Sequence, residues 1–151
     1  MTPLLRMLVR EGLRTGTVAG LAMIPFAMVF RSRGLRVNEY GRKMLELIVG
    51  DMSAPAHFAL TFAMHMLISW MAAVPLLLLL RGIPGRNRRW IAGLAYGAVF
   101  YVALNSLIMP MAFGDPTPWE LGFSTVYPSL TIHLVYGFAI ALVARPAAVA
   151  G

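Results

Sequence analysis

The chain has 151 residues, of which 59% are hydrophobic and 13% are charged, with a mean hydropathy of +0.73. A soluble domain carries roughly 25% charged residues, so this composition excludes a water-soluble globular protein. Cysteine is absent, which excludes disulfides and thiolate chemistry. The net charge is +7, and the basic residues lie at the ends of the apolar segments, where they can meet anionic head groups. We therefore expect a lipid bilayer and no nucleic acid as partner.

Three uncharged apolar segments exceed the roughly 20 residues that a helix needs to cross a bilayer, and a fourth, near the N-terminus, is slightly shorter. We therefore predict an all-α integral membrane protein, a four-helix bundle that forms one transmembrane domain over residues 1–151. The expected spans are residues 11–31, 55–80, 90–112 and 122–144. The uncharged part of the first span, Thr15–Phe30, is short, so we expect Arg10 and Arg14 to extend toward the head groups.

The distribution of basic residues predicts the orientation of the chain. One side of the membrane would carry eight of them: Arg6, Arg10, Arg14, Arg81, Arg86, Arg88, Arg89 and Arg145. The other side would carry five, all in the first loop: Arg31, Arg33, Arg36, Arg42 and Lys43. Basic residues concentrate in cytoplasmic loops, so we expect both termini in the cytoplasm.

The first loop contains an amphipathic pattern over residues 38–49. Its apolar positions at helical spacing are Tyr40, Met44, Leu47 and Ile48, and its basic residues are offset by Glu39, Glu46 and Asp51. This pattern favours a short helix that lies in the membrane interface. An ordinary solvated loop is the alternative.

Each span carries small or polar residues at steps of four, a spacing that stays on one face of a helix. Lipid tails favour none of these residues, so we expect them to face the bundle interior, where small residues let helix backbones approach closely. The expected packing residues are Gly12, Gly16, Gly20, Gly93, Gly97, Gly137 and Ala141. Leu77 and Val99 are expected to face lipid.

Polar members of these series fall in the outer half of the bilayer and are expected to line a cavity or ligand site. The candidates are His57, Thr61, His65, Asn105 and His133. A buried histidine can bind metal or haem, relay protons, or hydrogen-bond a neighbouring helix. His57 and His65 lie roughly 12 Å apart along one helix, too far to share an ion. His65 and His133 lie at comparable depth and could hold a b-type haem if their helices are neighbours.

Other chemistry is weakly indicated. Met64 and Met66 flank His65, and thioether with imidazole suits Cu(I), but alternate residues point to different sides of a helix, which favours packing. The metal therefore stays unknown. The apolar runs contain no carboxylate, and no Gly-rich phosphate loop, HExxH or GxSxG occurs, so we assign no catalytic residue.

Two sequence strings resemble a known family. They are Gly16-Thr17-Val18-Ala19-Gly20 followed by Pro25-Phe26, and Tyr127-Pro128 followed by His133-Leu134-Val135-Tyr136-Gly137. Both are similar to patterns in the YagU-like group of small bacterial inner-membrane proteins. The resemblance covers the first and fourth spans and implies a multi-helix protein of the bacterial inner membrane without an established activity.

These features favour a non-catalytic accessory or packing subunit of a membrane assembly, acting as a homo-oligomer or with other membrane subunits. One alternative is a haem- or quinone-associated electron-transfer subunit that uses the intramembrane histidines. Another is a permease for a small solute or metal ion. Four helices enclose little volume, so a transport path would require an oligomer.

Overall fold

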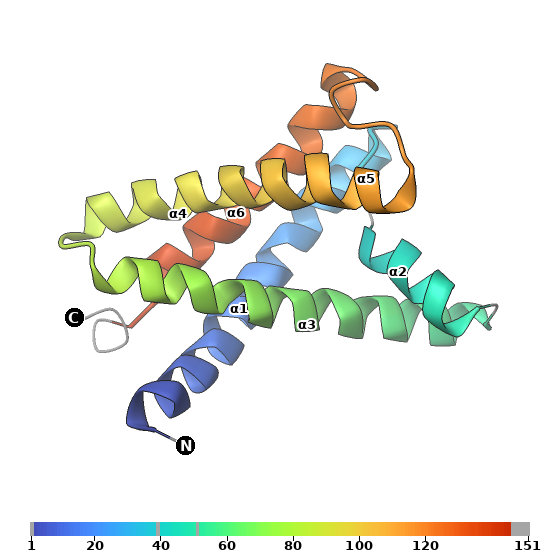
Figure 1. Ribbon diagram of the computed structural model, residues 1–151. Helices are drawn as coiled ribbons and strands as arrows, with labels where there is room; N and C mark the ends of the chain where they lie inside the picture. Colours follow the sequence, from blue (N-terminus) through green and yellow to red (C-terminus); the bar gives the residue numbers. More distant parts are fainter. Residues whose placement is uncertain (1, 39, 51, 146–151) are drawn as a thin grey trace.

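The computed structural model describes residues 2–38, 40–50 and 52–145, and these residues form helices and connecting turns without a strand (Figure 1). The helices are α1 (Pro3–Ser32), α2 (Tyr40–Val49), α3 (Ala54–Arg81), α4 (Arg86–Phe100), the π-helix η1 (Tyr101–Ile108), α5 (Met109–Phe113) and α6 (Phe123–Val143). In this part of the chain four helical stretches are long and apolar enough to cross a membrane, because α4, η1 and α5 run on as one. The prediction of an all-α membrane protein is confirmed.

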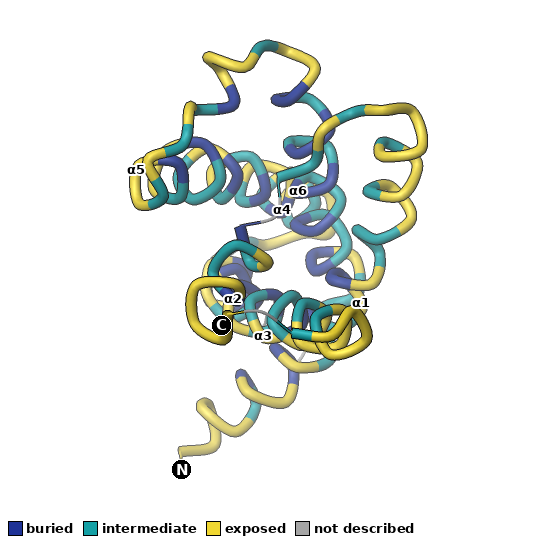
Figure 2. The backbone as a smooth tube through the Cα atoms, turned by 90° about the vertical axis from the view of Figure 1, so that its right-hand side faces the viewer, coloured by how far each residue is buried: buried dark blue, intermediate teal, exposed yellow. Residues whose placement is uncertain are grey.

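The spans pack in pairs around α6. Helix α1 contacts both α3 and α6, and α4 contacts α6, whereas α3 and α4 contact each other less, partly through the Tyr96 hydroxyl, which donates to the Ala72 carbonyl at 2.7 Å. Figure 1 shows both ends of the chain and this turn at one end of the molecule, and α2 at the other. Figure 2 shows that buried residues lie where the spans face one another, while the first turns of α1 are largely exposed.

Helix α1 is longer than the span predicted for it. Thr2 caps its start, since the Leu5 amide donates to Thr2 Oγ1 at 3.3 Å, and Pro3 occupies the first turn, where no amide hydrogen is needed. Its 30 residues extend about 45 Å at 1.5 Å per residue, compared with about 30 Å for the hydrocarbon core. Helix α1 is therefore longer than a single crossing requires.

The contact between α1 and α3 is made at glycines. A Cβ atom on Gly16 would lie 2.7 Å from the Ser69 carbonyl oxygen and 2.9 Å from Trp70 Cα. One turn further along, Gly20 faces the side chains of Met66 and Ser69 instead of the α3 backbone. No side chain fits between α1 and α3 at Gly16, so the two backbones are in direct contact there.

The contact between α4 and α6 has the same character. A Cβ atom on Gly97 would lie 2.8 Å from the His133 carbonyl carbon, and one on Gly93 would lie 2.8 Å from Ala141 Cβ. From the opposite side, Gly137 faces the backbone of Gly93, with its Cβ position 2.9 Å from the Gly93 carbonyl carbon. Cα hydrogens therefore face backbone carbonyls across this contact, a geometry that allows weak hydrogen bonds.

The third span departs from the uniform α-helix expected over residues 90–112. It widens into η1, in which the Met109 amide donates to the carbonyl of Leu104, five residues back. Pro110 gives the physical reason: it has no amide hydrogen, and in an α-helix its ring would collide with the carbonyl of Ser106. One extra residue in a helix turns everything after it by about 100°. The widening therefore changes which side chains of η1 and α5 face the bundle.

The first loop contains a helix, α2, over the residues where the amphipathic pattern indicated one, and part of it packs against the rest of the chain. Tyr40 and Leu45 are buried, and Tyr40 stacks on Phe113 with ring centroids 5.7 Å apart. Leu47 and Ile48 are 76% and 71% exposed and are left to contact lipid. Glu39 and Asp51, two of the carboxylates expected to offset the basic residues, lie outside the described residues.

The expectation for Leu77 is wrong. Leu77 is fully buried together with Leu76 and Leu80, because this end of α3 is covered by α1 and α6, including Ile140. Val99, by contrast, is 65% exposed on α4.

We predict that Gly97→Leu lowers the free energy of unfolding by about 3 kcal/mol or more, because the added side chain must separate α4 from α6. Val99→Phe adds the same number of carbon atoms two residues away on the exposed side of α4 and should change stability by less than about 0.5 kcal/mol. Unfolding of the purified protein in mixed detergent micelles measures both. Equal stabilities for the two variants would show that the glycine contact does not hold the helices together.

Candidate polar site between the spans

One polar contact inside the bundle joins η1 to α6. His133 is buried between the rings of Phe100 and Tyr101, at centroid distances of 5.8 and 5.6 Å. Its Nδ1 lies 2.6 Å from the Ser129 carbonyl oxygen and therefore donates, which leaves Nε2 to accept from the Asn105 amide at 3.1 Å. The structure thus brings two of the five predicted polar residues into direct contact.

Helix packing and the π-helix together produce this contact. Gly97 lets α4 approach the His133 carbonyl closely, and the π-helix then carries Asn105 toward the imidazole of the same residue. Asn105 Oδ1 is buried and has no hydrogen-bond partner within the described part of the chain. A buried acceptor without a partner costs about 1–3 kcal/mol, so this oxygen is a place where a donor would be stabilising.

His65 contacts a different helix. Its Nε2 lies 3.0 Å from the carbonyl oxygen of Gly20, so the imidazole donates to the backbone of α1. The approach is close because Gly20 has no side chain. Thr61, one turn earlier on α3, has a buried hydroxyl that is unpartnered among the described residues. His65 therefore ties α3 to α1, just as Asn105 ties η1 to α6 through His133.

His57 lies apart from both contacts, at the start of α3. Its Nε2 is 3.3 Å from the Glu46 carboxylate, which also lies 3.4 Å from the Arg42 guanidinium. This arrangement joins α2 to α3 at the surface. The five predicted residues therefore make three separate sets of contacts in the described part of the chain.

The geometry bears on the haem alternative. Both ring nitrogens of His133 and one of His65 already bond to protein groups. A haem held by both histidines would have to break one of the two hydrogen bonds of His133, to Asn105 or to Ser129. No cluster of three or more metal-binding side chains forms within residues 2–38, 40–50 and 52–145.

A buried ion pair was missed from the sequence. Glu11 is only 4% exposed and pairs with Arg14, whose Nη2 also donates to the carbonyl of Val143 at the end of α6. The amide of Arg145 donates to the same carboxylate at 2.9 Å. Arg14 therefore does not simply extend to the head groups, as predicted, but fastens α1 to the last residues of α6. The i, i+3 spacing of Glu11 and Arg14 is the signal that could have identified the pair.

The opposite end of the molecule has its own charged contact. Lys43 of α2 pairs with Asp115, which follows α5, and its ammonium lies 5.8 Å from the centroid of the Phe113 ring. Burial raises the pKa of the neighbouring Tyr40 hydroxyl, and the negative charge of Asp115 adds to that effect. These contacts hold α2 against the connection between the third and fourth spans.

We predict that Asn105 and His133 are energetically coupled. A double-mutant cycle with Asn105→Ala and His133→Ala should give a coupling energy of about 0.6–1.7 kcal/mol, the range measured for polar contacts between membrane helices. The control cycle pairs Asn105→Ala with His65→Ala, which share no hydrogen bond, and should give a value near zero. Equal coupling in the two cycles would contradict the separation of the polar contacts.

Comparisons with known proteins identify the family alone. No curated protein and no solved structure shows a significant match to the chain. None of the matches supports the resemblance to the YagU-like group. Residues 7–149 match the model described as a family of unknown function, DUF6789, and this match includes all four spans. The chain therefore belongs to the DUF6789 family.

Proposed function

We propose that the protein is a non-catalytic accessory or packing subunit of a membrane assembly in the bacterial inner membrane. The observation that carries this proposal is the use of its intramembrane polar groups. His65 donates to the backbone of α1, and His133 accepts from Asn105 while donating to its own helix. The polar side chains inside the membrane thus stabilise the packing of the chain itself.

The outer surface of the spans supports a role in assembly. Met71 on α3, Val99 on α4 and Leu142 on α6 are 67%, 65% and 53% exposed. These side chains are apolar and point away from the bundle, so lipid or the apolar face of another membrane helix can cover them. Packing between membrane helices relies on such shape-matched contacts.

The charges at the two ends support an orientation with both termini in the cytoplasm. The end that carries the termini has eight basic residues, and Glu11 is the one acidic residue in the sequence segments assigned to it. At the other end Lys43 pairs with Asp115, and Arg42 lies near Glu46. One end therefore has an excess of basic residues, whereas the other has basic residues next to carboxylates. Retention of basic residues in the cytoplasm would produce this difference between the two ends.

We predict that a membrane-impermeant maleimide distinguishes the two ends. The natural sequence has no cysteine, so single substitutions report one position each. In intact spheroplasts Pro116→Cys should be labelled, whereas Asn87→Cys should react only after the membrane is permeabilised. The opposite pattern would invert the proposed orientation.

We predict that one side of the bundle contacts another subunit. A photo-crosslinking amino acid at Met71, Val99 or Leu142, irradiated in native membranes, should give an adduct heavier than the 16.5 kDa chain at one or two of these positions. The positions that give no adduct serve as controls, because they are also exposed apolar positions on the spans. Monomeric protein at all three positions would contradict the accessory role.

A further inference from the structure

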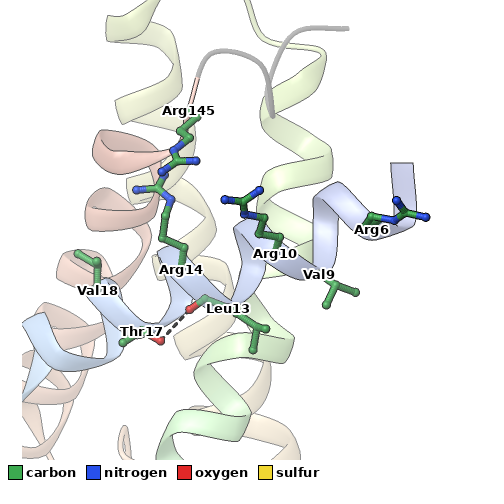
Figure 3. A pocket seen from close by; sticks show the side chains of 8 residues that line it. All are labelled: Arg6, Val9, Arg10, Leu13, Arg14, Thr17, Val18 and Arg145. Carbon is green, nitrogen blue, oxygen red and sulfur yellow. Dashed lines mark hydrogen bonds between the residues drawn. The ribbon is translucent and has the colours of Figure 1, made fainter. Parts of the chain in front are cut away.

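A hollow lined with arginines opens at the end of the molecule that carries both termini (Figure 3). It has a volume of about 730 Å³ and lies between the first half of α1 and the residues that follow α6. Its lining residues are Arg6, Val9, Arg10, Leu13, Arg14, Thr17, Val18 and Arg145. Four arginine side chains and three apolar side chains thus line one open hollow at the surface.

Two parallel ridges of α1 form most of this hollow. Arg6, Arg10 and Arg14 recur at steps of four, and Val9 and Leu13 follow the same spacing on the neighbouring ridge. Val9 and Leu13 are each 44% exposed, so the apolar ridge is open to a ligand. No carboxylate pairs with Arg6 or Arg10 among the described residues.

The nearest carboxylate is already engaged. Glu11 accepts from the Arg14 guanidinium and from the backbone amide of Arg145, which holds both residues in place. Arg14 makes its bonds to Glu11 and to Val143 through Nε and Nη2, and Nη1 makes none of these bonds. Figure 3 shows the guanidinium groups of Arg14 and Arg145 directed toward one another. One buried carboxylate leaves this group of four arginines with excess positive charge.

We propose that the hollow binds one anionic phospholipid of the surrounding bilayer. The phosphodiester oxygens accept hydrogen bonds from Arg10, Arg14 and Arg145, since guanidinium groups match phosphate geometry with paired N–H donors. An acyl chain lies along the wall formed by Leu13 and Val18. Phosphate chemistry alone would also suit a free ion, but the apolar wall adds binding free energy only for a lipid.

The depth of the hollow fits this ligand. The excess length of α1 places Arg6 and Arg10 among the head groups, where basic pockets attract anionic lipids. From Arg10 to Val18 the helix rises about 12 Å, which takes its surface from the head groups into the hydrocarbon. A single lipid molecule therefore reaches both the guanidinium groups and the apolar wall.

The test is native mass spectrometry of the purified full-length chain with dioleoylphosphatidylglycerol or dioleoylphosphatidylcholine, which share their acyl chains. The wild type should retain one phosphatidylglycerol in preference to phosphatidylcholine. Arg10→Gln and Arg145→Gln should each weaken that binding roughly fivefold, as expected for one basic residue at an anionic head group. The Arg145 charge also acts on the buried Glu11 carboxylate, so thermal unfolding in detergent checks that both variants remain folded.

The matched control is Arg88→Gln, which removes one exposed arginine at the same end of the molecule but outside the hollow. It should leave phosphatidylglycerol binding unchanged. Equal retention of the two lipids, or the same loss in Arg88→Gln as in Arg10→Gln, would overturn the proposal. Displacement of phosphatidylglycerol by an equal concentration of inorganic phosphate would also overturn it, by showing that the hollow binds phosphate without using the lipid tail.

Discussion

Direct contact between helix backbones is the constraint on which the rest of this structure depends. At Gly16 and Gly97 a single added carbon would lie within about 3 Å of the backbone of the facing helix. The hydrophobic effect does not drive helices together inside lipid, so dispersion contacts and polar contacts must do so, and both require close approach. Glycine makes that approach sterically available. Helices α1 with α3 and α4 with α6 are therefore two tightly joined pairs, held together where α1 also meets α6.

The polar contacts follow from these two pairs. His65 reaches the carbonyl of Gly20 where α1 and α3 are close, and His133 meets Asn105 just beyond the point where Gly97 lies against α6. Each imidazole thus reinforces a different helix pair. This division explains why the candidate residues form separate contacts, and it supports the proposed role in packing more than the alternatives that require a shared cofactor.

The two ends of the molecule have different electrostatic character. At the end with α2, the cations Lys43 and Arg42 lie near carboxylates, which limits their attraction for an anionic partner. At the end with the termini, the arginines around α1 share one buried carboxylate, Glu11. The same arginines that support a cytoplasmic orientation therefore supply the proposed lipid site, and Arg14 contributes in addition to the joining of α1 and α6.

The sequence by itself determined the number of spans and their approximate limits, because length and apolarity are local properties of the chain. For residues 40–49 its periodicity indicated a helix but left an ordinary loop as the alternative. It did not determine which helix covers which face. Leu77 is an apolar residue of the kind that also faces lipid, but it is enclosed by neighbours that only the crossing of the helices brings together. Likewise, Arg14 bonds to Val143, 129 residues away, and no local pattern specifies a contact of that separation. Tertiary structure decided these features because periodicity describes one helix at a time, whereas a partner is set by how closely two backbones can approach.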